Sequence, residues 1–322
     1  MRLKLVPAET SVDFFKITKA TFGASILAMI ASIILFFTMG LNYGIDFRGG
    51  TTIRTDSTQV VDVAAYRAVL ETLELGDISV IEIKDPLRDD LNATQIRFET
   101  QEGEEAASVD TVKAVKDALL GIDPNMTFPQ TESIGPEVSG ELVKSAVIAV
   151  LAAVSAVLFY IWLRFEWQFS VGAVAALVHD IVLTIGIFSL LQIKFDLAII
   201  AALLTIVGYS LNDTVVVFDR VRENLRKYKK KLLKDVLNQS INETLSRTVM
   251  TSITTLIALI SLFVLGGDVI RGFVFAMIWG VIVGTYSSVF VASAILLRLD
   301  VKRDWDKTND GKAGTQFAGI DA

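Results

Sequence analysis

The sequence contains no cysteine and a single histidine, His179. Without cysteine no disulfide and no thiolate metal site can form, and one histidine excludes a metal site built from several imidazoles. The one Gly-Lys pair, Gly311-Lys312, lacks both the upstream glycine and the following Ser or Thr of a P-loop. We therefore expect no cofactor, no metal and no ATP bound through such a loop. We also expect no nucleic-acid partner.

Apolar residues, by contrast, are abundant and charges are unevenly distributed. The 322 residues are 52% hydrophobic, and the mean hydropathy is +0.53. These values indicate a polytopic membrane protein rather than a soluble globular one. The net charge is −6, yet residues 41–142 hold 20 acidic and 8 basic residues. An acidic block beside a basic remainder predicts that the two parts lie in different compartments.

Six apolar stretches have about the 20-residue length that a membrane-spanning helix needs. We interpret the first as an uncleaved helix rather than a signal peptide, because no small-x-small cleavage site follows it. The predicted spans are residues 22–40, 143–163, 170–191, 195–218, 248–265 and 273–297.

Residues 41–142 are predicted to form a folded domain between the first two spans. Strand-like patterns occur near 45–54, 78–83, 95–100 and 126–134, and helix-like patterns near 60–73 and after Ser108. The order β-α-β-β-α-β is that of the ferredoxin-like, split βαβ arrangement. The predicted fold class is therefore an α-helical polytopic membrane protein with six transmembrane helices and an inserted α+β ferredoxin-like domain.

Basic residues predict the orientation. They are concentrated in residues 1–21, in the connection 219–247 and in the segment 298–322. The positive-inside rule places these three regions, and so both termini, in the cytoplasm and the 41–142 domain outside. We interpret 219–247 as a basic cytoplasmic loop; an amphipathic helix lying on the anionic inner leaflet is the alternative.

The most informative residue is Asp213, because an ionisable group within an apolar span is costly and marks a functional site by default. The next span enters from the same side and begins after Arg247, so antiparallel packing predicts that the two residues lie at similar depth. Contact with Arg247 would keep the Asp213 carboxylate ionised, and loss of the contact would favour protonation. A static ion pair that fixes helix register, or an arginine bound to lipid phosphate, remains the alternative.

Other polar residues lie near this pair. Asp180 is predicted near the middle of the third span, beside His179, where it could extend a proton path or bond to hydroxyl groups for packing. We predict proton coupling by Asp213, Arg247, Asn212 and Asp180, with a supporting polar path formed by Ser210, Thr214, Thr251, Thr254 and Thr255. Gly280 and Gly284 in the last span permit close helix packing. No catalytic constellation is predicted, because a Ser-His-Asp triad would need His179, which is buried in the membrane.

Several of these features occur together in a known family. They are Gly44-Ile45-Asp46-Phe47-Arg48-Gly49-Gly50, Gly135-Pro136, the run 210–224 with Asn212-Asp213-Thr214-Val215-Val216, Arg247-Thr248, and Gly284-Thr285-Tyr286-Ser287-Ser288. Over roughly residues 18–300 the chain resembles the SecF type of the bacterial SecD/SecF protein-export family, which is similar in build to half of a resistance-nodulation-division transporter.

The resemblance implies a function. It implies a heterodimer with SecD, beside the SecYEG translocon in the bacterial inner membrane, among membrane lipids and with the 41–142 domain in the periplasm. It implies that the proton-motive force drives a motion of the outside domains that helps to pull unfolded precursor polypeptides outwards. The family's essential aspartate and arginine correspond to Asp213 and Arg247. The alternatives are half of a proton-coupled lipid or drug exporter, and a scaffold of the translocon that uses no energy.

Overall fold

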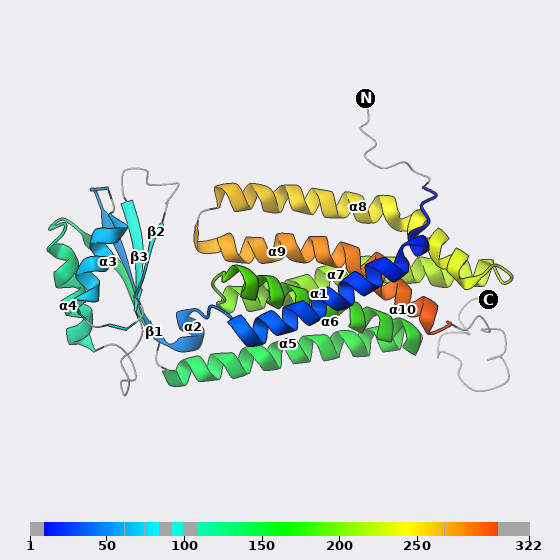
Figure 1. The fold of residues 1–322 in the computed structure, drawn as a ribbon, viewed down its shortest axis with the longest axis horizontal. Coiled ribbons are helices and arrows are strands. Elements are labelled where there is room, and N and C mark those ends of the chain that lie inside the picture. Colours follow the sequence, from blue (N-terminus) through cyan, green and yellow to red (C-terminus); the bar gives the residue numbers. More distant parts are fainter. Residues whose placement is uncertain are drawn as a thin grey trace, which may run out of the picture.

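The computed structural model describes residues 10–60, 62–73, 75–76, 78–83, 92–98, 108–134, 136–266 and 268–301. The predicted tail 298–322 therefore lies outside the described residues from position 302 onward, as do residues 1–9 at the other end. An α+β domain and a bundle of long helices follow one another along the longest axis of the molecule (Figure 1).

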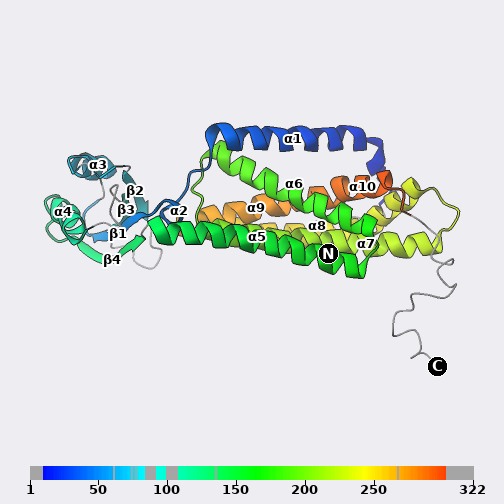
Figure 2. The same cartoon turned by 90° about the horizontal axis from the view of Figure 1, so that it is seen from below.

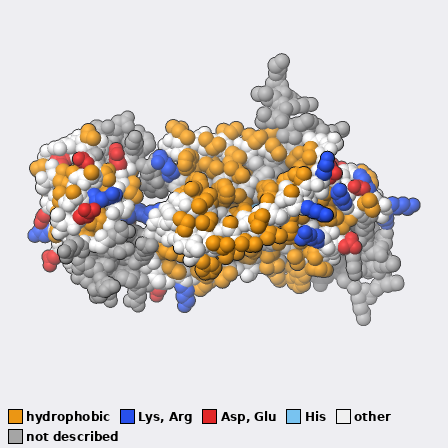
Figure 3. All heavy atoms as spheres, viewed as in Figure 1, with side chains coloured by type: hydrophobic (Ala, Val, Ile, Leu, Met, Phe, Trp, Pro, Cys, Tyr) orange, Lys and Arg blue, Asp and Glu red, His pale blue; other side chains and the backbone are white. Residues whose placement is uncertain are grey.

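The prediction of six spanning helices is confirmed: in the described ranges, six helices are long and apolar enough to cross a membrane. Hydrophobic side chains cover these helices, and Lys and Arg gather at the end away from the α+β domain (Figure 3). After a short 3-10 turn at Phe14–Lys16, the spanning elements are α1 (Thr18–Met39), α5 (Pro136–Arg164), α6 (Trp167–Leu191), α7 (Leu197–Lys227), α8 (Leu233–Leu265), and α9 (Asp268–Ser287) continued by the π-helix η2 (Ser288–Ala292) and α10 (Ser293–Arg298).

The structure differs from the loop predicted over 219–247. Helix α7 continues to Lys227 and α8 already begins at Leu233, so that only a short turn separates them. The apolar residues Leu225, Val236 and Leu237 are buried in one core cluster instead of facing lipid. Burial of this apolar stripe between the two helices stabilises the hairpin. The hydropathy pattern predicts only the apolar middle of each helix, because the ends also carry many charged residues.

The predicted ferredoxin-like fold of the α+β domain is confirmed by its strand order, β2-β3-β1-β4, with every neighbouring pair antiparallel. Ser108 caps α4 by accepting a hydrogen bond from the Thr111 N–H. Ile53, Leu70, Ile96 and Leu119 form the core between the sheet and its two helices. The elements are β1 (Gly50–Ser57), α3 (Val63–Glu71), β2 (Ile78–Ile83), β3 (Asn92–Phe98), α4 (Val109–Leu120) and β4 (Thr127–Ile134).

The expectation that the first strand begins at residue 45 is wrong. Residues Ile45–Arg48 form a short helix, α2, and β1 begins at Gly50. Gly49 and Gly50 have φ angles of +78° and +138°, which residues with a Cβ rarely adopt. The two glycines therefore turn the chain from α2 into the strand.

Hydrogen bonds join the segment before α2 to the loop between α6 and α7. The Phe195 N–H donates to the Asn42 carbonyl at 2.7 Å, and the Gly44 N–H donates to the Phe195 carbonyl at 2.8 Å. The Asp46 carboxylate accepts from the Leu197 N–H at 3.1 Å. The connection into the α+β domain is thus attached to the first residue of α7.

The predicted close packing at Gly280 is present, and it leads to a first testable prediction. A Cβ built at Gly280 would lie 2.3 Å from Ile206 Cγ1 of α7, whereas one built at Gly208 would have nothing within 4 Å. We expect Gly280→Ala to lower the unfolding free energy by about 1–3 kcal/mol, because α7 and α9 must move apart. The matched control Gly208→Ala should be neutral or stabilising by up to about 1 kcal/mol. Thermal unfolding in detergent measures both; equal effects would contradict the prediction.

Candidate functional site

Asp213 lies on α7 with 3% of its surface exposed. Its Oδ2 atom is buried and has no hydrogen-bond partner within the described part of the chain. A buried carboxylate oxygen without a donor strongly disfavours the charged form unless a cation or a proton compensates it. A proton on this carboxyl group, or a positive charge that approaches it, would offset the cost of its burial.

Arg247 lies on α8, which packs against α7. Its side chain is exposed on the surface of the helices. No ion pair within 4.0 Å joins the two among the described residues. The structure therefore brings the two predicted residues onto neighbouring helices without direct contact.

Asp180 lies on α6 with 1% exposure and is at the centre of a polar cluster. Its Oδ2 atom accepts hydrogen bonds from Ser210 Oγ on α7 at 2.6 Å and from Ser287 Oγ on α9 at 2.8 Å. Its Oδ1 atom lies 2.9 Å from His179 Nδ1. One carboxylate thus joins three spanning helices.

The His179 side chain extends this cluster towards α1. Its ring stacks on Tyr286 with the centroids 6.0 Å apart. The Tyr286 hydroxyl in turn donates to the Thr21 carbonyl at 2.8 Å and lies 2.9 Å from Ser25 Oγ. The opposite ring atom, His179 Nε2, is buried and has no partner within the described ranges.

The remaining predicted polar residues divide into those that face other helices and those that do not. Ser210 bridges to Asp180, whereas the Thr214, Thr251 and Thr254 hydroxyls donate to carbonyls of their own helices. Asn212 and Thr254 are exposed, and Thr255 is half-buried. Near these threonines, an α8 hydroxyl that does reach another helix is that of Ser252, which lies 2.7 Å from Thr285 Oγ1 of α9. The sequence prediction missed Ser252 because facing helices cannot be paired from one sequence.

A second group of charges lies where the α+β domain meets the helices. Arg97 on β3 is half-buried beside Asp46 and Asp196, and burial lowers the pKa of its guanidinium. Asp196 caps α7 through the Ile199 N–H, and burial raises the pKa of its carboxyl despite that hydrogen bond. These residues and Lys194 line a cavity of about 490 Å³. The sequence pattern predicts no role for these residues; its one signal here is that Asp46 lies within a glycine motif.

A proton relay is the chemistry that this arrangement permits. Asp180 and Asp213 lie on adjacent helices, and the Ser210 residue that bonds Asp180 is less than one turn from Asp213. In the described ranges, no group of three His, Cys, Asp or Glu residues could hold a metal ion.

Comparisons with known proteins place these features in a family. The family model for the protein export membrane protein SecD/SecF, C-terminal, matches residues 114–302, and that for the SecD/SecF GG motif matches residues 34–59. Among similar proteins, the protein translocase subunit SecF of Cereibacter sphaeroides is 60% identical over 322 residues, covering 100% of this chain and 99% of that protein.

Fused SecDF proteins are also similar. The protein translocase subunit SecDF of Brucella abortus is 38% identical, with 94% of this chain matching 39% of that protein. The crystal structure of SecDF from Thermus thermophilus, a translocon-associated membrane protein, superposes with a TM-score of 0.80 at 33% identity, covering 93% of this chain and 40% of that one. Full-length identity to a SecF protein, the two matching models and the shared fold agree: the chain belongs to the SecF family of protein translocase subunits.

Proposed function

We propose that this subunit works with SecD as a heterodimer that uses the proton-motive force to promote late steps of protein export. In this proposal Asp213 takes up and releases a proton, and Arg247 approaches or leaves it as the charge changes. The main support is that Asp213 Oδ2 is buried without a hydrogen-bond donor among the described residues. Arg247, on the neighbouring helix α8, is exposed on the surface. A carboxylate in such surroundings favours either protonation or contact with the arginine, which gives two alternative states.

The membrane potential provides enough energy for such a switch. One elementary charge moved across the whole potential releases about 2.3 kcal/mol per 100 mV. Two states of a domain that differ by a few kcal/mol can be repopulated by this amount. The absence of a P-loop from the sequence agrees with a proton source of energy.

Polar side chains on the surface of the helices support a membrane-embedded partner. Asn212, Arg247 and Thr254 are exposed on α7 and α8. Polar and charged side chains are unfavourable against lipid and usually face protein or water. We propose that SecD covers this face, and that it completes the site around Asp213.

The charge distribution supports an orientation. In the proposal the basic end of the helices and both termini lie in the cytoplasm of a bacterium, and the α+β domain lies in the periplasm. The subunit then lies in the inner membrane beside the SecYEG translocon. Its α+β domain is placed where unfolded precursor polypeptides emerge.

The hydrogen bonds between Asn42–Asp46 and Phe195–Leu197 offer a mechanical link. They attach the chain that enters β1 to the start of α7, the helix that carries Asp213. The second connection is α5, which begins at Pro136 directly after β4. A shift of α7 against α5 would therefore tilt the sheet, and the Asp46 bond would transmit that movement.

We predict that Asp46→Ala uncouples this link. Loss of the acceptor for the Leu197 N–H should cost about 1 kcal/mol locally and raise hydrogen exchange at residues 196–199. Proton-dependent stimulation of export should fall by at least half. The control is Asp62→Ala, which removes the same kind of cap from α3, where Asp62 accepts from the Ala64 and Ala65 N–H groups. If proton-dependent export is the same in both variants, the Asp46 carboxylate only stabilises the start of α7 and does not transmit movement.

Assembly is tested by purification from membranes. A tagged chain should retain SecD and the translocon in mild detergent, and an Asn212→Leu, Thr254→Leu variant should retain less SecD.

Normal export in a deletion strain that becomes drug-sensitive would favour the lipid or drug exporter instead. A deletion that impairs export, together with normal export by an Asp213→Asn variant, would favour a scaffold.

A further inference from the structure

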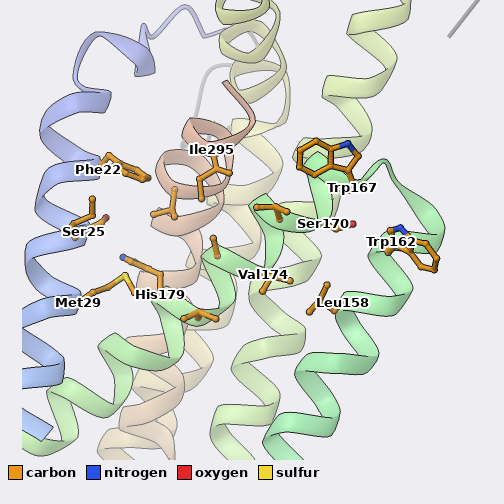
Figure 4. A pocket seen from close by; sticks show the side chains of 15 residues that line it. Phe22, Ser25, Met29, Leu158, Trp162, Trp167, Ser170, Val174, His179 and Ile295 are labelled. Atoms are coloured by element: carbon orange, nitrogen blue, oxygen red, sulfur yellow. The ribbon is translucent and has the colours of Figure 1, made fainter. Parts of the chain in front are cut away.

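A groove of about 560 Å³ opens on the outer face of the helices. Figure 2 shows α6 between α1 and α5, and both flanking helices pack against it. Residues of these three helices and of the η2–α10 segment line the groove (Figure 4). The rim residues Ile26, Trp162 and Trp167 are 45%, 58% and 56% exposed, so that in a membrane the groove opens towards lipid.

The groove runs inward from the basic end of the helices. Trp167 begins α6 at that end, and tryptophan at this position is typical of the headgroup level of a bilayer. Phe22 lines the groove close to the start of α1, and the Arg298 guanidinium carbon lies 4.3 Å from the centre of its ring. Lys19, three residues before Phe22, is exposed. Two cations, Arg298 beside Phe22 and Lys19 one helical turn before it, therefore lie near the mouth of the groove at headgroup depth.

Polar atoms without partners lie in the wall. Ser170, which is 3% exposed, has a buried Oγ with no hydrogen-bond partner in the described part of the chain. It lies three residues after Trp167, about 4.5 Å deeper by helical rise. This is the depth at which a lipid with its headgroup at Trp167 carries its ester carbonyls. His179 lies about 13 Å deeper still, where only an acyl chain would reach.

We infer that this groove is a binding site for one anionic phospholipid of the leaflet at the basic end. Arg298 and Lys19 bind the phosphate, the Ser170 hydroxyl donates to an ester carbonyl, and one acyl chain fills the groove as far as His179. Basic pockets between transmembrane helices recognise anionic headgroups by this chemistry. The bound chain covers the His179 ring and keeps water away from the His179–Asp180 pair.

The site has a position suited to regulation. Its two walls are α1 and α5, the helices from which the chain enters and leaves the α+β domain. Its floor includes Val291 of the π-helix η2, and π-helical segments often occur at functional sites. The lipid therefore holds α1 and α5 at a fixed separation.

The test uses the full chain together with its partner, and native mass spectrometry counts the lipids retained during titration with phosphatidylglycerol or phosphatidylcholine. We expect one phosphatidylglycerol to be retained preferentially. Arg298→Gln should weaken its retention about fivefold, as expected for one cation near the surface, and Lys230→Gln at the same end should not. Ala175→Phe, which fills the groove, should abolish retention, whereas Val264→Phe on the exposed face of α8 should have no effect. Ile26→Phe on the rim provides a second filling variant if Ala175→Phe does not fold.

Three results would overturn the proposal. Equal retention of both lipids would show that the groove makes only non-specific contacts with lipid. Unchanged phosphatidylglycerol retention in both filling variants would place the lipid elsewhere. A photoreactive residue at position 162 that cross-links to a protein segment, whether a partner helix or a precursor, would identify a different occupant.

Discussion

Asp213→Asn should remove the whole proton-dependent component of export while leaving the subunit folded and assembled. Asparagine is nearly isosteric with aspartate and cannot exchange a proton, so that the Arg247 side chain no longer experiences two charge states at this position. The fold should tolerate the change, because no described residue donates a hydrogen bond to the buried Oδ2 atom that would be lost. The measurement is precursor export into proteoliposomes that contain the complete complex, with and without an imposed proton gradient.

A control on the same helix shows whether the effect comes from Asp213 itself or from the loss of any negative charge on α7. Asp219 is 60% exposed and pairs with Arg164 at 3.1 Å, and exposed pairs of this kind contribute about 1 kcal/mol or less. Asp219→Asn should therefore keep full proton-dependent stimulation. Export by Asp213→Asn at the unmodified rate, with the gradient imposed, would refute proton coupling at this site and leave the scaffold role.

The sequence predicts the parts of the fold whose signal is local. The six spans can be predicted because crossing a bilayer requires long apolar runs. The order of strands and helices in the α+β domain can be predicted from alternating apolar and polar residues and from the cap at Ser108. The sequence predicts a loop where α7 and α8 form a helical hairpin, because lysine and arginine cover the outer side of the hairpin. Its stability comes from buried residues such as Val236.

The candidate site is less predictable because its contacts are long-range. Asp180 was identifiable as a carboxylate within a span, but its bonds to Ser210 and Ser287 join positions 30 and 107 residues away. The expected pairing of Asp213 with Arg247 rested on depth alone. Depth places two residues at one level, whereas rotation of each helix decides whether the side chains meet. Here Arg247 points to the surface.

Asp180→Ala should be among the most destabilising single substitutions in the helices. It leaves the buried Ser210 hydroxyl without an acceptor, leaves the Ser287 hydroxyl only the Gly284 carbonyl at 3.2 Å, and opens a cavity between α6, α7 and α9. Each unsatisfied buried polar group costs about 1–3 kcal/mol, so that we expect a loss of about 2–4 kcal/mol in unfolding free energy, measured by thermal or denaturant unfolding in detergent. Ser210→Ala or Ser287→Ala alone should cost less, because Asp180 Oδ2 keeps one of its two serine donors.

Asp180→Asn separates packing from proton transfer. The amide oxygen can accept from both serines. The amide nitrogen can donate to His179 Nδ1 when the neutral imidazole carries its proton on Nε2, so that all three contacts are kept. Stability should therefore stay within about 1 kcal/mol of the unmodified protein. If Asp180 extends the proton path from Asp213, this stable variant should still lose part of its proton-dependent export. Full export would assign Asp180 to joining the three helices, and Asp213 would then act without it.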